Sequence, residues 1–375
     1  MTEPRRPSGE ELFNPELATA AWRRRLKASE LGRIAAALYR RRRLPRQMLR
    51  APGGLLQRDA LAGVSQRRRV RTVVWIPAGP GALDGLLAAW ESVVASSPGE
   101  VALLVTDDWS PDAHADAVRV HVPEALVVRT HVPSGGPPRL WPVTSLAVSW
   151  ALRCFDFDHL VKFDTDALAV GPGWVEGIAQ AIERAQATPP VTGPEDGDGS
   201  AARALSADVP IGIAGSFIER PDGHVETDRA YHRAVLAGEV PRDRQLAGWV
   251  ARAEAGGWPA GSIVQGGCLV LTRAYAEALV AEGTLDYTPR LRTIVSEDLL
   301  LTVLAYAFGF RAASLGGPSG PLAIANKHLP LPLAELLDPG SRWLVAHSTK
   351  VGLDGEPESA LRERAARARA DWPAH

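Results

Sequence analysis

The chain has 375 residues, of which 46% are hydrophobic, so it can bury a core of ordinary size and is not a small protein that depends on disulfides. With 35 glycines, 30 prolines and a net charge of −1, it resembles a globular α/β enzyme more than a disordered or fibrous chain, and we expect no nucleic-acid partner. The two cysteines, Cys154 and Cys268, lie in apolar stretches, which predicts core residues in a reducing, cytoplasmic environment.

The N-terminal segment differs from the rest of the chain in charge. Residues 1–71 contain 18 Lys and Arg against 6 Asp and Glu, whereas the remaining 304 residues contain 24 against 37. Apolar side chains at helical spacing among arginines over 15–44 predict a basic helical extension over 1–70. Such a helix suits contact with an anionic membrane or polyanionic partner, and it also suits packing on the acidic surface of the following domain. Because no apolar run approaches the about 20 residues that span a bilayer, we expect a soluble or membrane-peripheral protein.

From Arg71 onward, apolar runs typical of strands alternate with helical patterns. The expected strands are 72–77, 101–106, 125–130, 160–163, 210–217 and 262–272. The expected helices are 83–95, 143–153, material within 228–255, a helix from 296 to 309 and a final Arg/Ala helix. This alternation predicts an α/β fold with a mostly parallel central sheet flanked by helices over 71–350, followed by a helical tail over 351–375. Ligands of such a sheet gather at the carboxyl ends of its strands.

Two acids follow the strand expected at 101–106. Asp107 and Asp108 could accept hydrogen bonds from a nucleobase or a ribose hydroxyl at the strand end. An Asx-type turn that leads into the next element explains the same residues without any ligand.

The strand expected at 160–163 ends in two carboxylates separated by one residue, Asp164 and Asp166. Mg²⁺ and Mn²⁺ prefer oxygen ligands and usually retain waters and substrate phosphates, so this pair predicts half of a divalent-cation site. A turn with a helix N-cap is the alternative, since such triplets also arise by chance.

Two later motifs add groups with possible chemistry. Glu297 and Asp298 stand where a helix is expected to begin, where one of them could serve as a catalytic base or where both could simply complement the helix dipole. His347 follows a short apolar run and Lys350 comes three residues later, so that one loop could offer an imidazole to a metal and an ammonium to a phosphate. A lone histidine is also common as a structural or exposed residue.

The order of these motifs resembles that of the GT-A glycosyltransferases, in particular the family 2 type, over about residues 71–350. The resemblance implies a GT-A (Rossmann-like) fold in which the opening strand ends at the proline turn, Pro77. It implies that Asp107 or Asp108 binds the nucleoside, and that Gly266 and Gly267 line the site of the donor sugar and acceptor.

The same resemblance implies a role for each of the remaining groups. Asp164, Asp166 and His347 would bind the metal, with Asp164 also near the donor ribose and diphosphate, and Lys350 would help to neutralise the phosphates. Asp298 is the implied base, and Glu297 is the alternate.

A metal-dependent transfer of a sugar from a nucleotide-sugar donor to an acceptor hydroxyl is therefore expected. The expected cofactors are Mn²⁺ or Mg²⁺ and a UDP-, GDP- or dTDP-sugar, the acceptor is a carbohydrate, a lipid-linked or a small molecule, and we expect inversion at the anomeric carbon. Trp109 stands where the family usually has Gly, and residues 132–142 are unusually rich in Pro, which leaves the subfamily and the stereochemistry open. No Q-x-x-R-W sequence follows Asp298, which disfavours a processive synthase.

Three other functions remain open at this point. A haloacid dehalogenase-like phosphatase would use Asp164 as its nucleophile, although Ala167 and Leu168 replace the Gly-Thr usual in that family. A nucleotidyltransferase would need a Gly-rich phosphate loop with a basic partner after the first strand, and the sequence has no such combination there. A non-catalytic carbohydrate- or nucleotide-binding protein could share the same fold.

Overall fold

The computed structural model describes residues 67–99, 101–108, 113–129, 140–188, 208–217, 229–287, 295–317, 320–370 and 372. The helix predicted over 15–44, Trp109 and the prolines at 137 and 138 lie outside the described residues. In the part of the chain that is described, no helix combines the length and the apolar character needed to cross a membrane.

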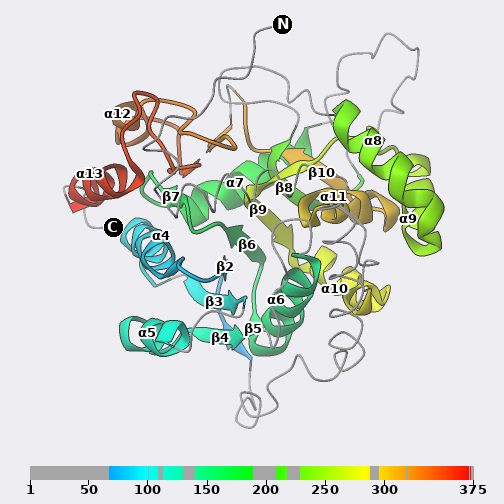
Figure 1. Ribbon diagram of the computed structural model, residues 1–375, viewed down its shortest axis with the longest axis horizontal. Helices are drawn as coiled ribbons and strands as arrows, with labels where there is room; N and C mark the ends of the chain where they lie inside the picture. Colours follow the sequence, from blue (N-terminus) through cyan, green and yellow to red (C-terminus); the bar gives the residue numbers. More distant parts are fainter. Residues whose placement is uncertain are drawn as a thin grey trace, which may run out of the picture. The chain divides into compact units, whose positions relative to one another are not determined.

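A seven-stranded sheet with the order β10-β8-β9-β6-β2-β3-β4 forms the centre of the fold (Figure 1). β9 runs antiparallel to β6 and β8, and the other neighbouring pairs are parallel. The mostly parallel central sheet of an α/β fold is therefore confirmed. Its strands are β2 (Thr72–Ala78), β3 (Val101–Asp107), β4 (Leu126–Arg129), β6 (His159–Phe163), β8 (Ile211–Phe217), β9 (Val264–Thr272) and β10 (Arg311–Ser314).

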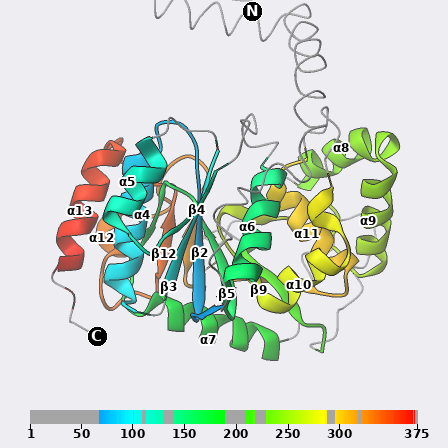
Figure 2. The same cartoon turned by 90° about the horizontal axis from the view of Figure 1, so that it is seen from below.

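Helices cover both faces of this sheet, which is why its central strands are apolar on both sides. Figure 2 shows α4 (Leu83–Ser96), α5 (Ala113–His121) and α13 (Glu358–Ala370) on one side, and α6 (Trp141–Cys154), α10 (Arg273–Ala281) and α11 (Glu297–Ala307) on the other. α7 (Trp174–Ala187) packs in the same core as α4, whereas α8 (Arg229–Glu239) and α9 (Arg244–Ala255) pack in the core of α11. The helices α5, α7 and α10 were not predicted from the sequence.

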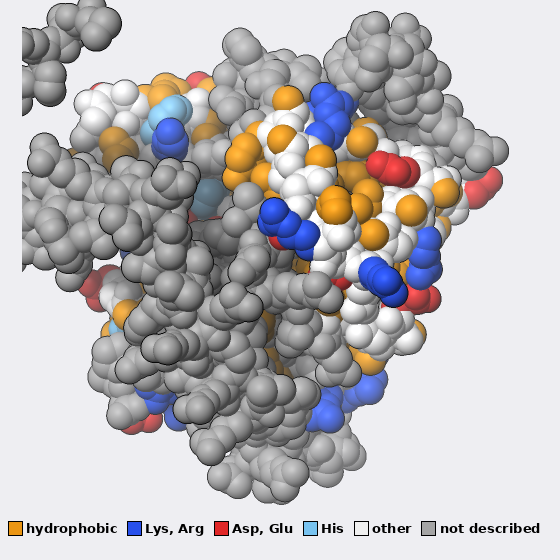
Figure 3. Space-filling view, turned by 45° about the vertical axis from the view of Figure 1, so that its right-hand side comes forward, with side chains coloured by type: hydrophobic (Ala, Val, Ile, Leu, Met, Phe, Trp, Pro, Cys, Tyr) orange, Lys and Arg blue, Asp and Glu red, His pale blue; other side chains and the backbone are white. Residues whose placement is uncertain are grey.

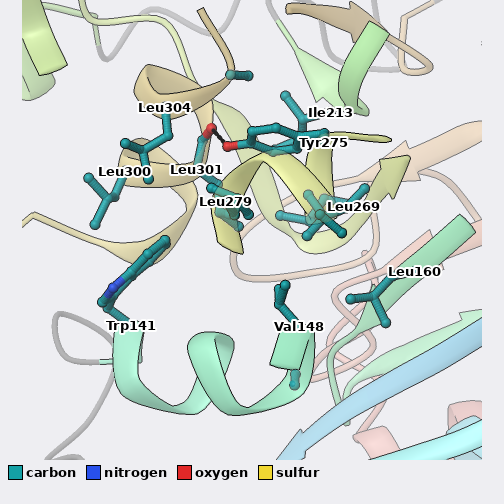
Figure 4. Close-up of a cluster of buried hydrophobic side chains, with 14 of the residues drawn as sticks. Trp141, Val148, Leu160, Ile213, Leu269, Tyr275, Leu279, Leu300, Leu301 and Leu304 are labelled. Atoms are coloured by element: carbon teal, nitrogen blue, oxygen red, sulfur yellow. Dashed lines mark hydrogen bonds between the residues drawn. The ribbon is translucent and has the colours of Figure 1, made fainter. Parts of the chain in front are cut away.

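The core between α6, α10 and α11 shows how helical spacing produces this packing. Trp141 and Val148 are seven residues apart and therefore lie on one face of α6, and in Figure 4 they point toward Leu279 of α10 and Leu300 of α11. The buried hydroxyl of Tyr275 donates a hydrogen bond to the carbonyl of Leu301, so burying this ring leaves its polar end satisfied.

Two small sheets complete the fold. β7 (Ala167–Ala169), β11 (Leu322–Ile324) and β12 (Val345–His347) form a three-stranded sheet with β12 in the middle, parallel to β11 and antiparallel to β7. β1 (Arg68–Arg69) pairs with β5 (Phe155–Asp156). The short α12 (Leu333–Leu336) and α13 pack on the three-stranded sheet. These two- and three-residue strands were not predicted, and they bring the last part of the chain against residues 164–169.

Candidate active site

Asp164 and Asp166 lie in the turn that joins β6 of the large sheet to β7 of the small one. The amide of Asp164 donates to the carbonyl of Gly267 at 3.1 Å, and the amide of Ala167 donates to the carbonyl of Asp164 at 2.9 Å. A turn does occur at this point, as the alternative interpretation expected. It also places His347 beside both acids, because β7 pairs with β12 so that Ala167 is opposite His347.

Two carboxylates and one imidazole come together at this turn. Ligand atoms of Asp164, Asp166 and His347 all lie within 4.8 Å of one another. Nε2 of His347 is 3.3 Å from Oδ2 of Asp166 and 3.9 Å from Oδ2 of Asp164. This combination of carboxylate oxygens and an imidazole nitrogen fits Mn²⁺ or Mg²⁺, with further positions left for water or phosphate oxygens.

Asp166 is the most strongly held member of the cluster. Its Oδ2 accepts a hydrogen bond from the Ser348 hydroxyl at 2.6 Å and lies 3.1 Å from Nζ of Lys350. Its backbone carbonyl accepts from the amide and the hydroxyl of Thr349 at 2.8 and 3.0 Å. Burial opposes ionisation, but the hydrogen bonds and charges of His347, Ser348 and Lys350 outweigh it and hold the pKa of Asp166 well below its usual range. Asp166 is therefore an anion throughout the neutral range.

Gly267 of β9 leaves the space that His347 fills. A Cβ built on Gly267 would lie 2.2 Å from Nδ1 of His347, a distance that no side chain can accommodate without displacing the imidazole. The sequence singled out this glycine for the donor sugar and acceptor, and the structure places it directly against the imidazole.

Glu297 and Asp298 begin α11 on the other side of Gly266. The nearest carboxylate oxygens of both acids lie 3.5 Å from the position that a Cβ on Gly266 would take. Glu297 is buried and Asp298 is half-buried. Burial raises the pKa of Glu297 to about 7, against the opposing charge of the nearby ammonium of Lys162.

Lys162 connects the two groups of acids. Its Nζ lies 2.8 Å from Oδ1 of Asp164 and 3.3 Å from Oε1 of Glu297, and it donates to the carbonyl of Gly266 at 2.7 Å. The late His347, the acids after β6 and the acids of α11 therefore belong to one continuous cluster.

The remaining predicted residues lie at the same carboxyl edge of the sheet but on other strands. Pro77 is the penultimate residue of β2, and Asp107 ends β3 opposite Ala78, two strands away from β6. Asp107 is buried, with Oδ2 3.8 Å from Nε of Arg129, whereas Asp108 is half-buried. Of the two acids, Asp108 is the more accessible to a ligand.

Four charged or ionisable groups of the site are buried, namely Lys162, Asp166, Glu297 and His347. On the face drawn in Figure 3, the Lys and Arg side chains of the described residues are dispersed among hydrophobic and uncharged side chains. The described part of that face shows no continuous basic band.

Comparison with known proteins gives likenesses of fold. No protein-family model and no curated protein match the sequence. One similar solved structure is the mannosyltransferase PcManGT from Pyrobaculum calidifontis in complex with GDP-Man and Mn²⁺, with 19% identity, a TM-score of 0.36 and coverage of 79% of this chain and 66% of that one. Another is S. aureus TarS 1-349 in complex with UDP-GlcNAc, with 14% identity, a TM-score of 0.37 and coverage of 66% of this chain and 56% of that one.

At these identities the likenesses concern the fold alone: one structure is of a mannosyltransferase with GDP-Man and Mn²⁺, and the other is of a protein with UDP-GlcNAc. The chain spans less than two thirds of the length of either protein.

Several residues of the site were missed by the sequence analysis. The sequence analysis gave Lys162 no role, although a charged residue within an apolar strand is a usable signal of a buried partner. Ser348 and Thr349 carried no signal, because their contacts with Asp166 span more than 180 residues of sequence. The same is true of Arg362 in α13, which donates to the carbonyl of Thr165 at 2.8 Å.

Proposed function

We propose that this protein is a metal-dependent glycosyltransferase that moves a sugar from a UDP-, GDP- or dTDP-sugar to an acceptor hydroxyl. The observation that supports this most directly is the convergence of Asp164, Asp166 and His347. This cluster is joined through Lys162 to the acids of α11, so that a cation site and a candidate base share one location.

In this proposal, Asp164, Asp166 and His347 hold Mn²⁺ or Mg²⁺. When bound, the cation offsets the negative charge of the departing nucleoside diphosphate. Lys350, whose side chain is 58% exposed while its ammonium lies 3.1 Å from Asp166, adds a positive charge that a diphosphate can reach.

Asp298 is our candidate for the base that takes the proton from the acceptor hydroxyl. It is half-buried, as a base that must meet substrate requires, and its carboxylate lies near the space left open by Gly266. Glu297 stays the alternate, because it is buried and paired with Lys162. A single displacement assisted by one base inverts the anomeric carbon.

The nucleoside is assigned to the carboxyl ends of β2 and β3. Asp108 is the preferred acceptor for a hydrogen bond from the base or ribose because it is more accessible than Asp107, and Pro77 would border the same position. The acceptor class, a cytoplasmic location and membrane contact through the N-terminal extension stay predictions.

The proposal is tested with Asp166→Asn, which keeps the size of the side chain and removes its charge. We expect this change to lower Mn²⁺-dependent transfer or donor hydrolysis by at least about 100-fold, because several kcal/mol of transition-state stabilisation depend on the cation. The assay is turnover of a panel of UDP-, GDP- and dTDP-sugars, with Mn²⁺ binding measured in parallel. Asp116→Asn on α5, where the side chain is 82% exposed, is the matched control and should behave as wild type.

Near-normal metal-dependent turnover by Asp166→Asn would remove the central assignment. A phosphoaspartate trapped on Asp164 would identify a phosphatase instead. Donor binding without turnover of any sugar in the panel would indicate a binding protein on the same fold.

A further inference from the structure

Lys162 is a charged side chain enclosed in the sheet. Only 2% of its side chain is exposed, and its neighbours Val161 and Phe163 on β6 belong to the hydrophobic core. Burying an ammonium is costly unless it is paired and hydrogen-bonded. The ammonium of Lys162 therefore requires nearby oxygen acceptors that offset the free-energy cost of its burial.

The ammonium of Lys162 has three hydrogens to donate, and three oxygens surround it. They belong to the carboxylates of Asp164 and Glu297, at 2.8 and 3.3 Å, and to the carbonyl of Gly266, at 2.7 Å. These partners come from the turn after β6, the start of α11 and the first part of β9. Lys162 thus joins three elements at one point.

The two carboxylate oxygens of Asp164 face different groups because of the ion pair with Lys162. Oδ1 lies against Lys162, while Oδ2 is directed toward the cluster, 3.9 Å from Nε2 of His347. The side chain of Asp164 is 29% exposed, and of its two charged neighbours Lys162 is the nearer, at 2.8 Å against 3.9 Å for His347. Anchoring one oxygen of a carboxylate presents the other to a cation in a defined direction.

We propose that Lys162 is a positioning residue that turns the free oxygen of Asp164 toward the bound cation and holds the start of α11 beside it. The inference rests on the proposed function, because it takes Asp164 to be a ligand of the cation. It adds a residue that touches neither the cation nor the substrate.

If only its charge mattered, Lys162 would weaken Mn²⁺ binding, whereas a positioning role strengthens it. An ammonium this close to Asp164 repels Mn²⁺, so removing it should tighten binding if its only effect is electrostatic. The double variant Lys162→Met/Glu297→Gln removes one positive and one negative charge and so keeps the net charge of the site. The single variant Lys162→Met would leave the carboxylate of Glu297 buried without its ammonium partner and is therefore prone to misfolding. The double variant avoids this.

The experiment measures Mn²⁺ binding to the full chain by electron paramagnetic resonance of free Mn²⁺, at about pH 8, where Glu297 is ionised. Three proteins are compared: wild type, Glu297→Gln and the double variant. We expect the double variant to bind Mn²⁺ about 10–100-fold more weakly than Glu297→Gln, the range found when a partner of a metal ligand is lost. If Lys162 acted through charge alone, the double variant would bind more tightly than Glu297→Gln and match wild type.

Binding by the double variant that equals or exceeds that of Glu297→Gln overturns the inference. Thermal unfolding without metal shows whether each variant is folded, and a purely structural Lys162 would lower the melting temperature without changing the affinity of the folded protein. Asp166→Asn separates the two proposals. If it loses Mn²⁺ while the double variant keeps it, only the role of Lys162 fails. If Asp166→Asn keeps Mn²⁺, the cation site and this inference fail together.

Discussion

At the scale of single residues, Gly267 gives the sharpest constraint on the site. A methyl group on this glycine would occupy the space of the His347 imidazole, 2.2 Å from Nδ1. We therefore expect Gly267→Ala to displace the imidazole and weaken Mn²⁺ binding by about 10-fold or more, with an equal loss of turnover. Titration of Mn²⁺ against the variant measures the first effect.

Gly248 of α9 is the matched control for that substitution. Nothing lies within 4 Å of a Cβ built there, and the residue is exposed within a helix. Gly248→Ala should leave Mn²⁺ binding unchanged and stabilise the fold by about 0.5–1 kcal/mol. Equal effects of the two substitutions on Mn²⁺ affinity would contradict the placement of His347 against β9.

The raised pKa of Glu297 links stability to pH. The folded protein holds this proton up to about pH 7, whereas the ordinary pKa of glutamate is 4.5. The contribution of Glu297 to stability is therefore fully present below about pH 4.5 and is lost as the pH rises through about 7. In metal-free protein, the free energy of unfolding of wild type relative to Glu297→Gln should fall by a few kcal/mol, in order of magnitude, over that window. Urea unfolding of both proteins at several pH values checks this, and parallel curves would show that Glu297 titrates normally.

At the scale of elements, α13 contacts the turn that carries Asp164 and Asp166. Arg362 reaches from this helix to the carbonyl of Thr165, the residue between the two aspartates, at 2.8 Å. Gly85 of α4 leaves room for the contact, since a Cβ there would lie 2.8 Å from both the guanidinium and that carbonyl. A helix from the far end of the sequence thus supports the turn that carries Asp164 and Asp166.

Arg362→Met removes the hydrogen bond to Thr165 and the ion pair with Glu358. We expect it to lower the free energy of unfolding by about 1–2 kcal/mol and to weaken Mn²⁺ binding several-fold. Arg367→Met on the same helix removes a guanidinium that is 70% exposed and pairs with Glu363 on the helix surface, so it should change stability by less than about 0.5 kcal/mol. Denaturant unfolding and Mn²⁺ titration of both variants distinguish them. Indistinguishable results would mean that α13 does not support the turn.

Elements with strong apolar patterns were predictable, and short ones were not. The strand expected at 101–106 is β3, and the helix expected at 83–95 is α4, within one residue at their ends. β7 and β12 have three residues each, too few to show a period, and their pairing joins residues about 180 positions apart. α7 carries an amphipathic pattern that the sequence analysis did not use.

The site was predictable to a similar extent. Asp107 and Asp164 could be placed at one edge because parallel strands of a sheet end on the same side. The contacts of Lys162 with Gly266 and Glu297 could not, because they depend on β9 running antiparallel to β6, which no local pattern reveals.

At the scale of the whole molecule, the candidate ligands belong to parts of the chain that meet only in the folded state. Asp164 and Asp166 follow β6, and His347 ends β12. An unfolded chain therefore has no such site, and Mn²⁺ should bind the native state alone. At about 100 times its dissociation constant the ion should add about 2.7 kcal/mol to the free energy of unfolding.

Thermal unfolding with and without Mn²⁺ measures this effect. Addition of a chelator should reverse it, and Asp166→Asn should abolish it. A shift of the same size in Asp166→Asn would place the bound ion elsewhere in the protein.

The pairing of β12 with β7 also determines when, during synthesis of the chain, the candidate cation site is complete. A nascent chain that has left the ribosome as far as α11 already contains both aspartates, Lys162 and the acids at positions 297 and 298, yet it lacks the imidazole. Because His347 closes a loop of about 180 residues onto Ala167, its arrival is among the slow, long-range steps of folding. Under the proposed function, binding of the cation, and with it of the donor, should therefore wait until β12 has docked.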